Sequence, residues 1–479
     1  MVFQNNVLSG AAGSGTTVHT IDQSIRFDLA SATYMQRTHG AGGNVDASTI
    51  SFWFKRSTLG VEVTMFGTGA SVYSTFDIFF KTDDTLFIQD YQSSYNLYLG
   101  TTQLFRDTSA WYHLVFAYDS AQAIETERAR LYINGQRVTS FGGASPSPKY
   151  PSQNADSILG SNTTIGFGRY ISYGSSNTNQ YFRGYLAEMN YVNGQALTPD
   201  SFGETNDSGI WIPKEYSGSY GTGGFHIDGR DSADLGDDES GNGNDMTTSG
   251  LAAHDQVSDS PTNNFCTFNS LDNRGSGTLS EGALKMAFAA TNDNVTGTFG
   301  MSSGKWYWEA YIVDFNNTYI GVQDSNVSAT GYAEKAVALW YGGYIYEDDS
   351  DTGDRAIATS GAAYTNGDVV GVAFDADNKK IWWSKNGQWY TANSSSTSTI
   401  AISDVVAGNS AQVITRSPDF FMPFFGNYTD STAIFNFGQE GTFSGNKTAG
   451  GNSDGNGVGN FFSAVPSGFL ALCTKNLGS

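Results

Sequence analysis

Residues 367–389, GDVVGVAFDADNKKIWWSKNGQW, place two tryptophans side by side directly before an Asn-Gly pair. The alternation of apolar and polar residues predicts β-strands, and Asn-Gly is typical of a tight turn. Successive side chains on a strand point to opposite faces of the sheet, so Trp382 and Trp383 cannot both enter the same core. One ring therefore packs in a core, and the other lies in a different environment.

The composition of all 479 residues also favours β-strands. Aromatic residues make up 14% of the chain and there are 57 glycines, whereas only 15% of residues are charged. Lys, Glu and Leu are too scarce for long helices, and the abundant Gly, Ser, Thr, Asn and aromatic residues are typical of short strands joined by turns. The length is sufficient for two or three domains. The composition therefore predicts an all-β protein.

The formal net charge of −22 excludes some classes of partner. A phosphate backbone would be repelled, so we expect no nucleic-acid binding. No apolar run approaches the roughly 18 residues of a membrane span, and the N-terminus lacks the features of a secretory leader, so we expect synthesis in a cytoplasm and no membrane insertion. Two cysteines are too few for a disulfide scaffold. The many acidic groups favour solubility and supply oxygen ligands for cations.

Shifts in composition divide the chain into four parts. Residues 1–20 are small and polar and are interpreted as an N-terminal arm or attachment segment. Residues 21–205 and 263–479 each contain enough strand patterns for an antiparallel, jelly-roll-like β-sandwich. Residues 206–262 are rich in Gly, Asp, Ser and Asn and are predicted to be a connector with little core of its own. The predicted fold is two β-sandwich domains in series.

Individual strands can be placed within both sandwiches. The clearest predicted strands are 49–57, 75–81, 85–90, 111–119, 129–138, 163–170, 182–197, 304–314, 318–324, 335–348, 367–389 and 420–438. Within 129–138, the Asn134-Gly135 pair separates two short strands. Both residues tolerate positive φ, so this pair predicts a two-residue type I′ hairpin.

Several of these segments resemble known families. TISFWFKRSTLG (49–60), WYHLVFAYD (111–119) and RLYINGQRV (130–138) resemble the laminin-G-like, concanavalin-A-like lectin fold, and GYLAEMNYVNGQALTPDSFGE (184–204) looks like its closing strand. GKWYWE (304–309), the 367–387 hairpin and FFMPFFGNY (420–428) resemble a SPRY domain. Both folds serve many functions, so either resemblance alone implies little about activity.

The segments between the two domains carry a more specific resemblance. GIWIPKEYSGSYGTGGFHID (209–228), DESGNGNDMT (238–247) and SDSPTNNFCTFN (258–269) are similar to a cassette found between these two domains in tailed-bacteriophage virion proteins. Together the resemblances cover nearly the whole chain after residue 20. They imply a virion protein made of a laminin-G-like domain followed by a SPRY-like domain.

The SPRY resemblance assigns a face to each tryptophan of the opening stretch. In such hairpins the positions before Asn-Gly are apolar, polar and large aromatic in turn. By position, Ile381 and Trp383 are core residues, and Trp382 stands where a polar residue is usual, so we expect its ring to face outward. That ring is either covered by a loop or a neighbouring chain, or it forms a ligand or partner surface. The second alternative makes Trp382 a candidate ligand-binding residue.

Catalytic signals are weak throughout the chain. Retaining glycoside hydrolysis needs two carboxylates about 5–5.5 Å apart, but the Glu-x-Asp-x-x-Glu strand of the related glucanases does not occur, and Glu188 and Glu309 each stand alone on their strands. The five histidines are scattered without the paired spacing typical of zinc ligands. His113 fits a hydrogen-bonded structural role. We therefore expect no catalytic residues and no enzyme.

Two acidic loops are candidate calcium sites. DDESGNGNDM contains the first candidate ligand set, Asp237, Asp238, Asn242, Asn244 and Asp245. DSDTGD contains the second, Asp349, Asp351 and Asp354. Both offer oxygen ligands at short spacing, but Asn and Asp also cap their own backbone in ordinary solvated turns. No cofactor is required by this interpretation, and calcium stays an open alternative.

Tyrosines in glycine-rich loops are the remaining binding signal. Tyr170 and Tyr173 lie in GRYISYGSSN, and Tyr341, Tyr344 and Tyr346 lie in WYGGYIYEDD. An aromatic face beside carboxylates and amides suits a pyranose, because one side of the sugar stacks and its hydroxyls bond at the rim. Such loops also contact proteins. These five tyrosines are therefore candidate ligand-binding residues.

These features together predict a non-enzymatic structural protein on the surface of a tailed-phage virion, either a tail fibre or a capsid fibre or knob. We expect it to contact other virion proteins, to form a homo-oligomer such as a trimer, and to attach to a host-surface glycan or protein. Many copies would strengthen weak single sites. The alternative is an architectural protein that decorates or cements the shell without a ligand, and a glycoside hydrolase comes third.

Overall fold

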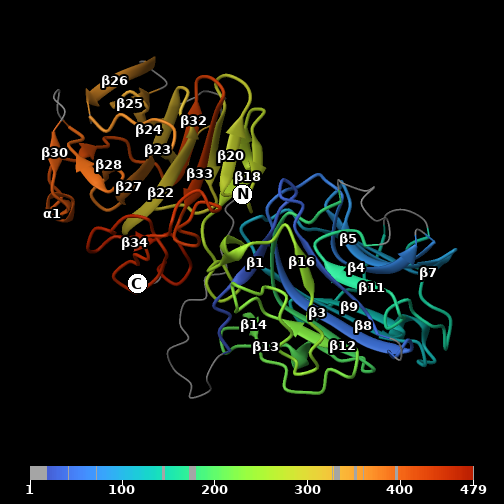
Figure 1. Cartoon of the computed structure of the whole chain (residues 1–479). Coiled ribbons are helices and arrows are strands. Elements are labelled where there is room, and N and C mark those ends of the chain that lie inside the picture. The colour runs from blue at the N-terminus through green and yellow to red at the C-terminus, as the bar shows by residue number, and fades with distance from the viewer. Residues whose placement is uncertain are drawn as a thin grey trace. The chain divides into compact units, whose positions relative to one another are not determined.

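The computed structural model describes residues 19–40, 43–71, 73–142, 146–171, 180–325, 327, 335–349, 353–359, 361–393 and 398–477, with only the backbone at 348–349, 353–356 and 359. The chain divides into two compact units, Met1–Asn263 and Asn264–Ser479, which we call the first and second units (Figure 1). Each is built from antiparallel sheets, which confirms the all-β fold class. The described residues contain one α-helix, α1 (Ile402–Val406).

Two sheets form the sandwich of the first unit. The strands of sheet 1 are β1 (Ser24–Phe27), β3 (Ala47–Arg56), β8 (Tyr112–Asp119), β9 (Ala129–Ile133), β10 (Gln136–Arg137), β12 (Gly184–Asn193), β15 (Phe225–Ile227) and β17 (Gln256–Val257). Their order is β10-β9-β8-β3-β12-β1-β17, with β15 also paired to β12. The strands of sheet 2 are β2 (Tyr34–Thr38), β4 (Val63–Ser71), β5 (Ser74–Phe80), β6 (Thr85–Gln92), β7 (Tyr95–Leu104), β11 (Thr164–Phe167) and β16 (Thr247–Ser249). Their order is β16-β2-β11-β4-β5-β6-β7.

The core of the first unit lies between these two sheets. Alternate side chains of facing strands meet there, as strand periodicity requires. Phe54 of β3 and Phe80 of β5 are fully buried, with ring centroids 5.6 Å apart. The predicted hairpin at Asn134-Gly135 is confirmed, since both residues have positive φ (48° and 76°) and join β9 to β10.

Residues 206–262 were predicted to be a connector with little core of its own, but the structure joins them to the first unit. They supply β14 (Trp211–Pro213), which pairs with β13 (Gly203–Thr205), and then β15, β16 and β17, which extend both sheets. Short strands satisfy the unpaired backbone groups at sheet edges. At two or three residues each, they are too short to show a period in the sequence. The segment therefore belongs to the first unit.

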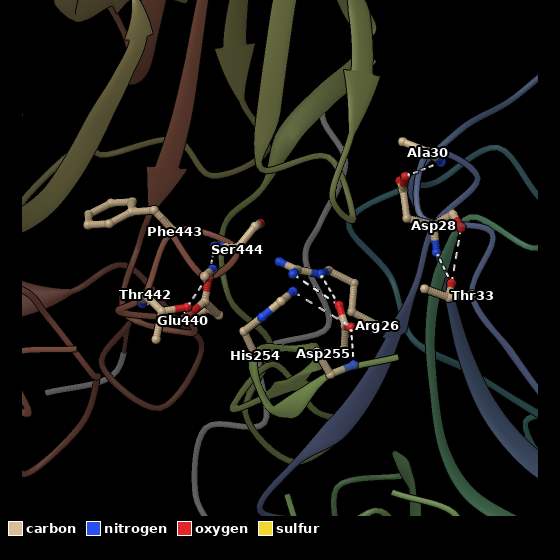
Figure 2. Close-up of polar contacts among 12 residues, drawn as sticks. Arg26, Asp28, Ala30, Thr33, His254, Asp255, Glu440, Thr442, Phe443 and Ser444 are labelled. Carbon is tan, nitrogen blue, oxygen red and sulfur yellow. Dashed lines mark hydrogen bonds and ion pairs between the residues drawn. The ribbon is translucent and has the colours of Figure 1, made fainter. Parts of the chain in front are cut away.

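Buried side-chain bonds hold this segment to the sandwich. The Arg26 guanidinium of β1 donates to Asp255 at 3.1 and 3.2 Å, and Asp255 also accepts the Ala252 N–H (Figure 2). Trp211 Nε1 donates to His113 Nδ1 at 3.0 Å. Because Nδ1 accepts this bond, Nε2 carries the proton and donates to Ser51 Oγ at 2.9 Å. Burial lowers the pKa of His113 to about 3, which is consistent with a neutral, structural histidine.

The second unit is also a two-sheet sandwich. The strands of sheet 3 are β18 (Phe268–Arg274), β21 (Asn294–Gly297), β23 (Thr318–Asp324), β24 (Ala336–Trp340), β25 (Tyr344–Asp349), β26 (Gly353–Thr359) and β32 (Phe421–Asn427). Their order is β18-β21-β32-β23-β24-β25-β26. The strands of sheet 4 are β19 (Thr278–Ser280), β20 (Lys285–Phe288), β22 (Lys305–Asp314), β27 (Val369–Asp375), β28 (Lys380–Lys385), β29 (Gln388–Tyr390), β30 (Thr399–Ile400), β31 (Gln412–Val413), β33 (Ser431–Asn436) and β34 (Leu470–Ala471). Their order is β19-β20-β33-β22-β27-β28-β29-β30, with β31 on β28 and β34 parallel to β22.

The two tryptophans of β28 lie on opposite faces of sheet 4, as predicted. Trp383 and Ile381 pack in the core between the sheets, where Trp383 Nε1 donates to Ile320 O at 2.9 Å. Trp382 belongs to a separate apolar cluster on the outer face. It is nevertheless 0% exposed, because Phe469 meets its ring edge-on at 6.0 Å and Asn409 O accepts its Nε1–H at 2.6 Å. The covering residues come from the same chain.

Buried carboxylates hold the C-terminal segment over sheet 4. Glu309 of β22 accepts the backbone N–H groups of Phe462 at 2.8 Å and Ser463 at 2.7 Å. Glu440 accepts the N–H of Ser444 at 2.6 Å and closes the turn shown in Figure 2. Burial raises the pKa of Glu309, and these backbone bonds oppose that rise. The C-terminal segment thereby covers the outer face of sheet 4, where its Phe461 and Phe469 join the apolar cluster of Trp382.

Candidate functional site

The outer face of sheet 2 carries aromatic rings that do not belong to the core of the sandwich. Phe79 of β5, Phe87 of β6 and Tyr98 of β7 form a separate cluster with half-buried Tyr95, and we call these four residues the aromatic strip. Successive ring centroids are 5.7 Å (Phe79 to Phe87), 5.2 Å (Phe87 to Tyr98) and 4.4 Å (Tyr98 to Tyr95) apart. The strip runs across three neighbouring strands because their outward positions lie beside one another.

Two hollows of the surface meet at Tyr95. The first, of about 290 Å³, is lined by Glu62, Thr64, Phe79, Lys81, Gln89, Tyr95, Tyr98, Tyr170 and Gln180. The second, of about 490 Å³, is lined by Gln92, Ser94, Tyr95, Asn96, Lys149, Tyr150, Ser152, Asn154, Ala155 and Asp156. The aromatic strip lies mainly in the first hollow, whereas the second is lined mainly by polar groups. Among the described residues, Tyr95 alone lines both.

Charged and amide groups surround the strip in defined positions. Lys81 Nζ donates to the Tyr98 hydroxyl at 2.8 Å and lies 3.9 Å from the centroid of Phe87. This cation–π contact holds the ammonium group beside the rings. Across the hollow the Gln180 amide donates to the Glu62 carboxylate. Phe79, Phe87 and Tyr98 are only 8%, 1% and 4% exposed, so the first hollow offers mainly the half-buried ring of Tyr95 beside fixed hydrogen-bonding groups.

Asp77 lies beneath this polar layer. It is 1% exposed, and its Oδ2 accepts hydrogen bonds from Thr75 Oγ1 at 2.8 Å and Gln89 Nε2 at 2.9 Å. Its Oδ1 is buried and has no hydrogen-bond partner among the described residues. Burial raises the pKa of Asp77 to about 7, against the lowering effect of the Gln89 and Thr75 bonds. Asp77 therefore fixes the Gln89 amide in the first hollow while retaining an unused acceptor.

The structure brings one predicted tyrosine to these hollows. Tyr170 lines the first hollow, and Tyr173 lies outside the described residues. The other three tyrosines lie in the second unit around Trp340, with ring centroids 4.3 Å (Tyr341), 5.9 Å (Tyr344) and 5.9 Å (Tyr346) from it.

These three tyrosines differ in their exposure. Tyr341 packs against the core of the second unit, and Tyr346 packs on Tyr319 at 5.5 Å. Tyr344 alone is 45% exposed. For Trp382 the structure agrees with the alternative in which other chain covers the ring. Its assignment as a ligand-binding residue is corrected, because Phe469 and the segment around Asn409 leave no ring face for a ligand.

The first predicted calcium loop is stabilised as a capped turn. Asp238 accepts the backbone N–H groups of Ser240 at 3.0 Å and Asn244 at 2.8 Å. Asn242 and Asn244 donate their amides to Gly224 O. Asp245 accepts the Asp238 N–H, and Asp237 is exposed. The carboxylates of Asp238 and Asp245 accept N–H groups of the loop's own backbone, so the geometry favours the capped-turn alternative. Of the second loop, Asp351 and the side chains of Asp349 and Asp354 lie outside the described residues.

The aromatic strip was missed in the sequence, although a signal for it was present. Phe79 and Phe80 are adjacent on a predicted strand, so one of them had to face away from the core, as argued for Trp382 and Trp383. Strand β7, which carries Tyr95 and Tyr98, was not predicted at all. Its neighbours Asn96 and Gly100 weaken the strand pattern.

Comparison with known proteins agrees with the fold of the first unit. Residues 29–201 match the family model described as the concanavalin A-like lectin/glucanases superfamily. This range contains all the strands that carry the aromatic strip. The match supports carbohydrate binding in general for this sandwich. No curated relative matches the chain by sequence.

Solved structures show distant similarity to parts of the chain. The SPRY domain of human HERC1 is 17% identical with a TM-score of 0.26, covering 35% of this chain and 96% of that one. A heptameric SAP-like pentraxin from Limulus polyphemus is 17% identical with a TM-score of 0.27, covering 38% and 80%. A candidate carbohydrate-binding protein from Bacteroides ovatus is 13% identical with a TM-score of 0.28, covering 48% and 58%. Similarity at this level does not indicate what the chain binds. Within the described residues, no helix has the length and apolar character needed to cross a membrane.

Proposed function

We propose that the first unit binds a glycan at the two hollows that meet at Tyr95. The observation that carries this proposal is the half-buried ring of Tyr95, which lines both hollows beside fixed polar groups, on the sandwich that matches the concanavalin A-like superfamily. A pyranose presents an apolar face that stacks on a ring and hydroxyls that bond to amides and carboxylates. Gln89 and Glu62 supply such groups in the first hollow, and Asn96 and Asp156 supply them in the second. A chain of two or more sugars fits a site made of two adjoining hollows.

The site is proposed to bind its glycan without hydrolysing it. Retaining hydrolysis needs two carboxylates about 5–5.5 Å apart. Among the described lining residues, each hollow contains one carboxylate, Glu62 in the first and Asp156 in the second. Glu62 is also paired with Gln180. This arrangement supports recognition rather than catalysis.

The proposed setting is the surface of a tailed-phage virion, as a tail fibre or a capsid fibre or knob. The support is the order of sequence segments between the two domains, which resembles a phage cassette. In that setting a homo-oligomer, such as a trimer, attached to other virion proteins would present many copies of the site to host-surface glycans. Multivalency would then raise the avidity of a weak single site.

A glycan array followed by calorimetry with the best oligosaccharide tests the proposal. Tyr95→Ala removes the ring shared by both hollows, and we expect it to weaken binding about tenfold, or roughly 1.4 kcal/mol. Tyr73→Ala is the matched control, since Tyr73 is 66% exposed and lines neither hollow. Equal binding by both variants would contradict the site. Absence of binding by the folded, oligomeric wild type would favour the architectural role, and release of shorter sugars would show a hydrolase.

A further inference from the structure

Side chains that are far apart in the sequence gather around Glu188 of β12. His226 of β15 places its Nε2 at 2.8 Å from Glu188 Oε2. His19, which precedes β1, places its Nε2 at 3.8 Å from Glu188 Oε1. Asp228 directly follows β15, and one ligand atom from each of Glu188, His226 and Asp228 lies within 4.8 Å of the others. The histidines show no paired spacing along the chain, because the fold rather than a local motif brings these groups together.

The spacing of these atoms suits a tetrahedral metal. Bonds of about 2.0 Å to zinc place neighbouring ligand atoms roughly 3.3 Å apart. The two distances to Glu188 oxygens, 2.8 and 3.8 Å, bracket that value. His19 Nε2 is shielded from solvent and has no hydrogen-bond partner at normal length among the described residues. Glu188, His226 and Asp228 thus form the compact part of the cluster, and His19 adjoins it through the second oxygen of Glu188.

Neighbouring groups hold the cluster in place. Tyr220 stacks on the His226 ring at 6.0 Å with an interplanar angle of 5°. The backbone of β12 bulges between Ala187 and Asn190, and Glu188 has a φ of 49°, which turns its side chain out of the regular strand pattern. Arg230 pairs with Asp228 and orients its carboxylate. Metal ligands in proteins are typically positioned by partners of this kind.

We propose that His19, Glu188, His226 and Asp228 form a binding site for a divalent transition metal of the zinc type. Two imidazoles with two carboxylates suit zinc, whereas calcium and magnesium prefer sites made only of oxygen ligands. The bound ion would link the segment at His19 to β12 and β15, and so stabilise the start of the first unit. This site is separate from the two hollows, and its occupancy does not depend on glycan binding.

Metal uptake by the full chain tests the proposal. After treatment with EDTA and dialysis, titration with zinc chloride should show one zinc ion per chain by calorimetry and elemental analysis. The zinc-loaded protein should melt at a higher temperature than the stripped protein, since a ligand of the native state stabilises it. Cobalt(II) should bind in its place and give the intense visible absorption of a tetrahedral centre.

Variants separate this site from adventitious binding. His226→Ala and Glu188→Gln should each lose the bound zinc and the rise in melting temperature. His19→Ala removes a ligand that lies outside every strand, so it reports on the site even where the other variants fold poorly. His254→Ala is the control, because His254 lies 3.9 Å from the Asp255 carboxylate but outside the cluster. Absence of stoichiometric zinc in the wild type, or its retention in the folded His19 and His226 variants, would overturn the proposal.

Discussion

Sheet 2 of the first unit and sheet 4 of the second unit both carry aromatic rings on the face turned away from the core. On sheet 4 the ring of Trp382 is fully buried against Phe469. On sheet 2 the ring of Tyr95 is half-buried and lines two hollows. The side chains are alike in chemistry, and what differs is whether later chain crosses over them. An aromatic residue on the outer face of a sheet therefore indicates a binding surface only when no other part of the chain covers its ring.

The covering of sheet 4 is held by polar anchors as well as by apolar contacts of Phe461 and Phe469. Glu309 accepts two backbone N–H groups from the C-terminal segment, at Phe462 and Ser463. Charge-assisted bonds of this kind are stronger than neutral ones, and they need no apolar pattern in the covering chain. Together with the apolar contacts of Phe461 and Phe469, these bonds allow a glycine-rich C-terminal segment to bury a tryptophan.

Removal of the buried ring should have the largest effect. Trp382→Ala leaves a cavity beside Phe469, and we expect the free energy of unfolding of the second unit to fall by about 3–5 kcal/mol. Urea unfolding followed by tryptophan fluorescence measures this loss. Glycan binding by the folded variant should be unchanged. A stable variant with impaired glycan binding would show that Trp382 is a ligand platform after all.

Neutralising Asp77 should have an intermediate, pH-dependent effect. The native state retains the Asp77 proton up to a pKa of about 7, whereas the unfolded chain releases it near 3.8. Between these values the native state binds more protons, so this group's contribution to stability is fully present below about pH 4 and is lost as the pH rises to 7. Asp77→Asn removes that loss. Its stability relative to wild type should thus rise by a few kcal/mol between pH 4 and pH 8, at about 1.4 kcal/mol per pKa unit.

Urea midpoints at the two pH values measure this difference. Asp207→Asn, at an exposed position, is the control and should show no such trend. A constant difference between wild type and Asp77→Asn across the pH range would show that Asp77 is ionised in the native state. Asp77 Oδ1 would then have to be better solvated than its burial and lack of a described hydrogen-bond partner indicate.

Removal of the Lys81 charge should have the smallest effect. Lys81→Met keeps much of the side chain but loses the bond to the Tyr98 hydroxyl and the contact with Phe87. We expect glycan affinity to fall by a few-fold, since such contacts are worth about 0.5–1 kcal/mol at partly exposed sites. Calorimetry with the array-derived oligosaccharide measures the change. An unchanged affinity would place the ligand in the second hollow alone.

Much of the fold follows from the sequence, because strand periodicity and turn chemistry are local. The opposite faces of Trp382 and Trp383 and the turn at Asn134-Gly135 are examples. The strands of residues 206–262 were not predicted. They are two or three residues long, and the sheet edges with which they pair determine where they form. Such pairing is a tertiary effect that no local pattern contains.

The candidate site was less accessible to prediction. Of the residues proposed from the sequence, Tyr170 lines a hollow and Trp382 is buried. The positions of Tyr95, Lys81 and Gln89 depend on how three strands align, and the sequence does not fix that register. Likewise, His19 and His226 come together only because β15 pairs with β12. In both cases long-range pairing creates the site.

The most direct test of the central claim is a crystal structure of the full chain with the oligosaccharide that binds best on the array. We expect a sugar ring stacked on Tyr95, with its hydroxyls bonded to the polar groups of the two adjoining hollows. A sugar bound elsewhere, for example around Trp340 and exposed Tyr344 of the second unit, would contradict it.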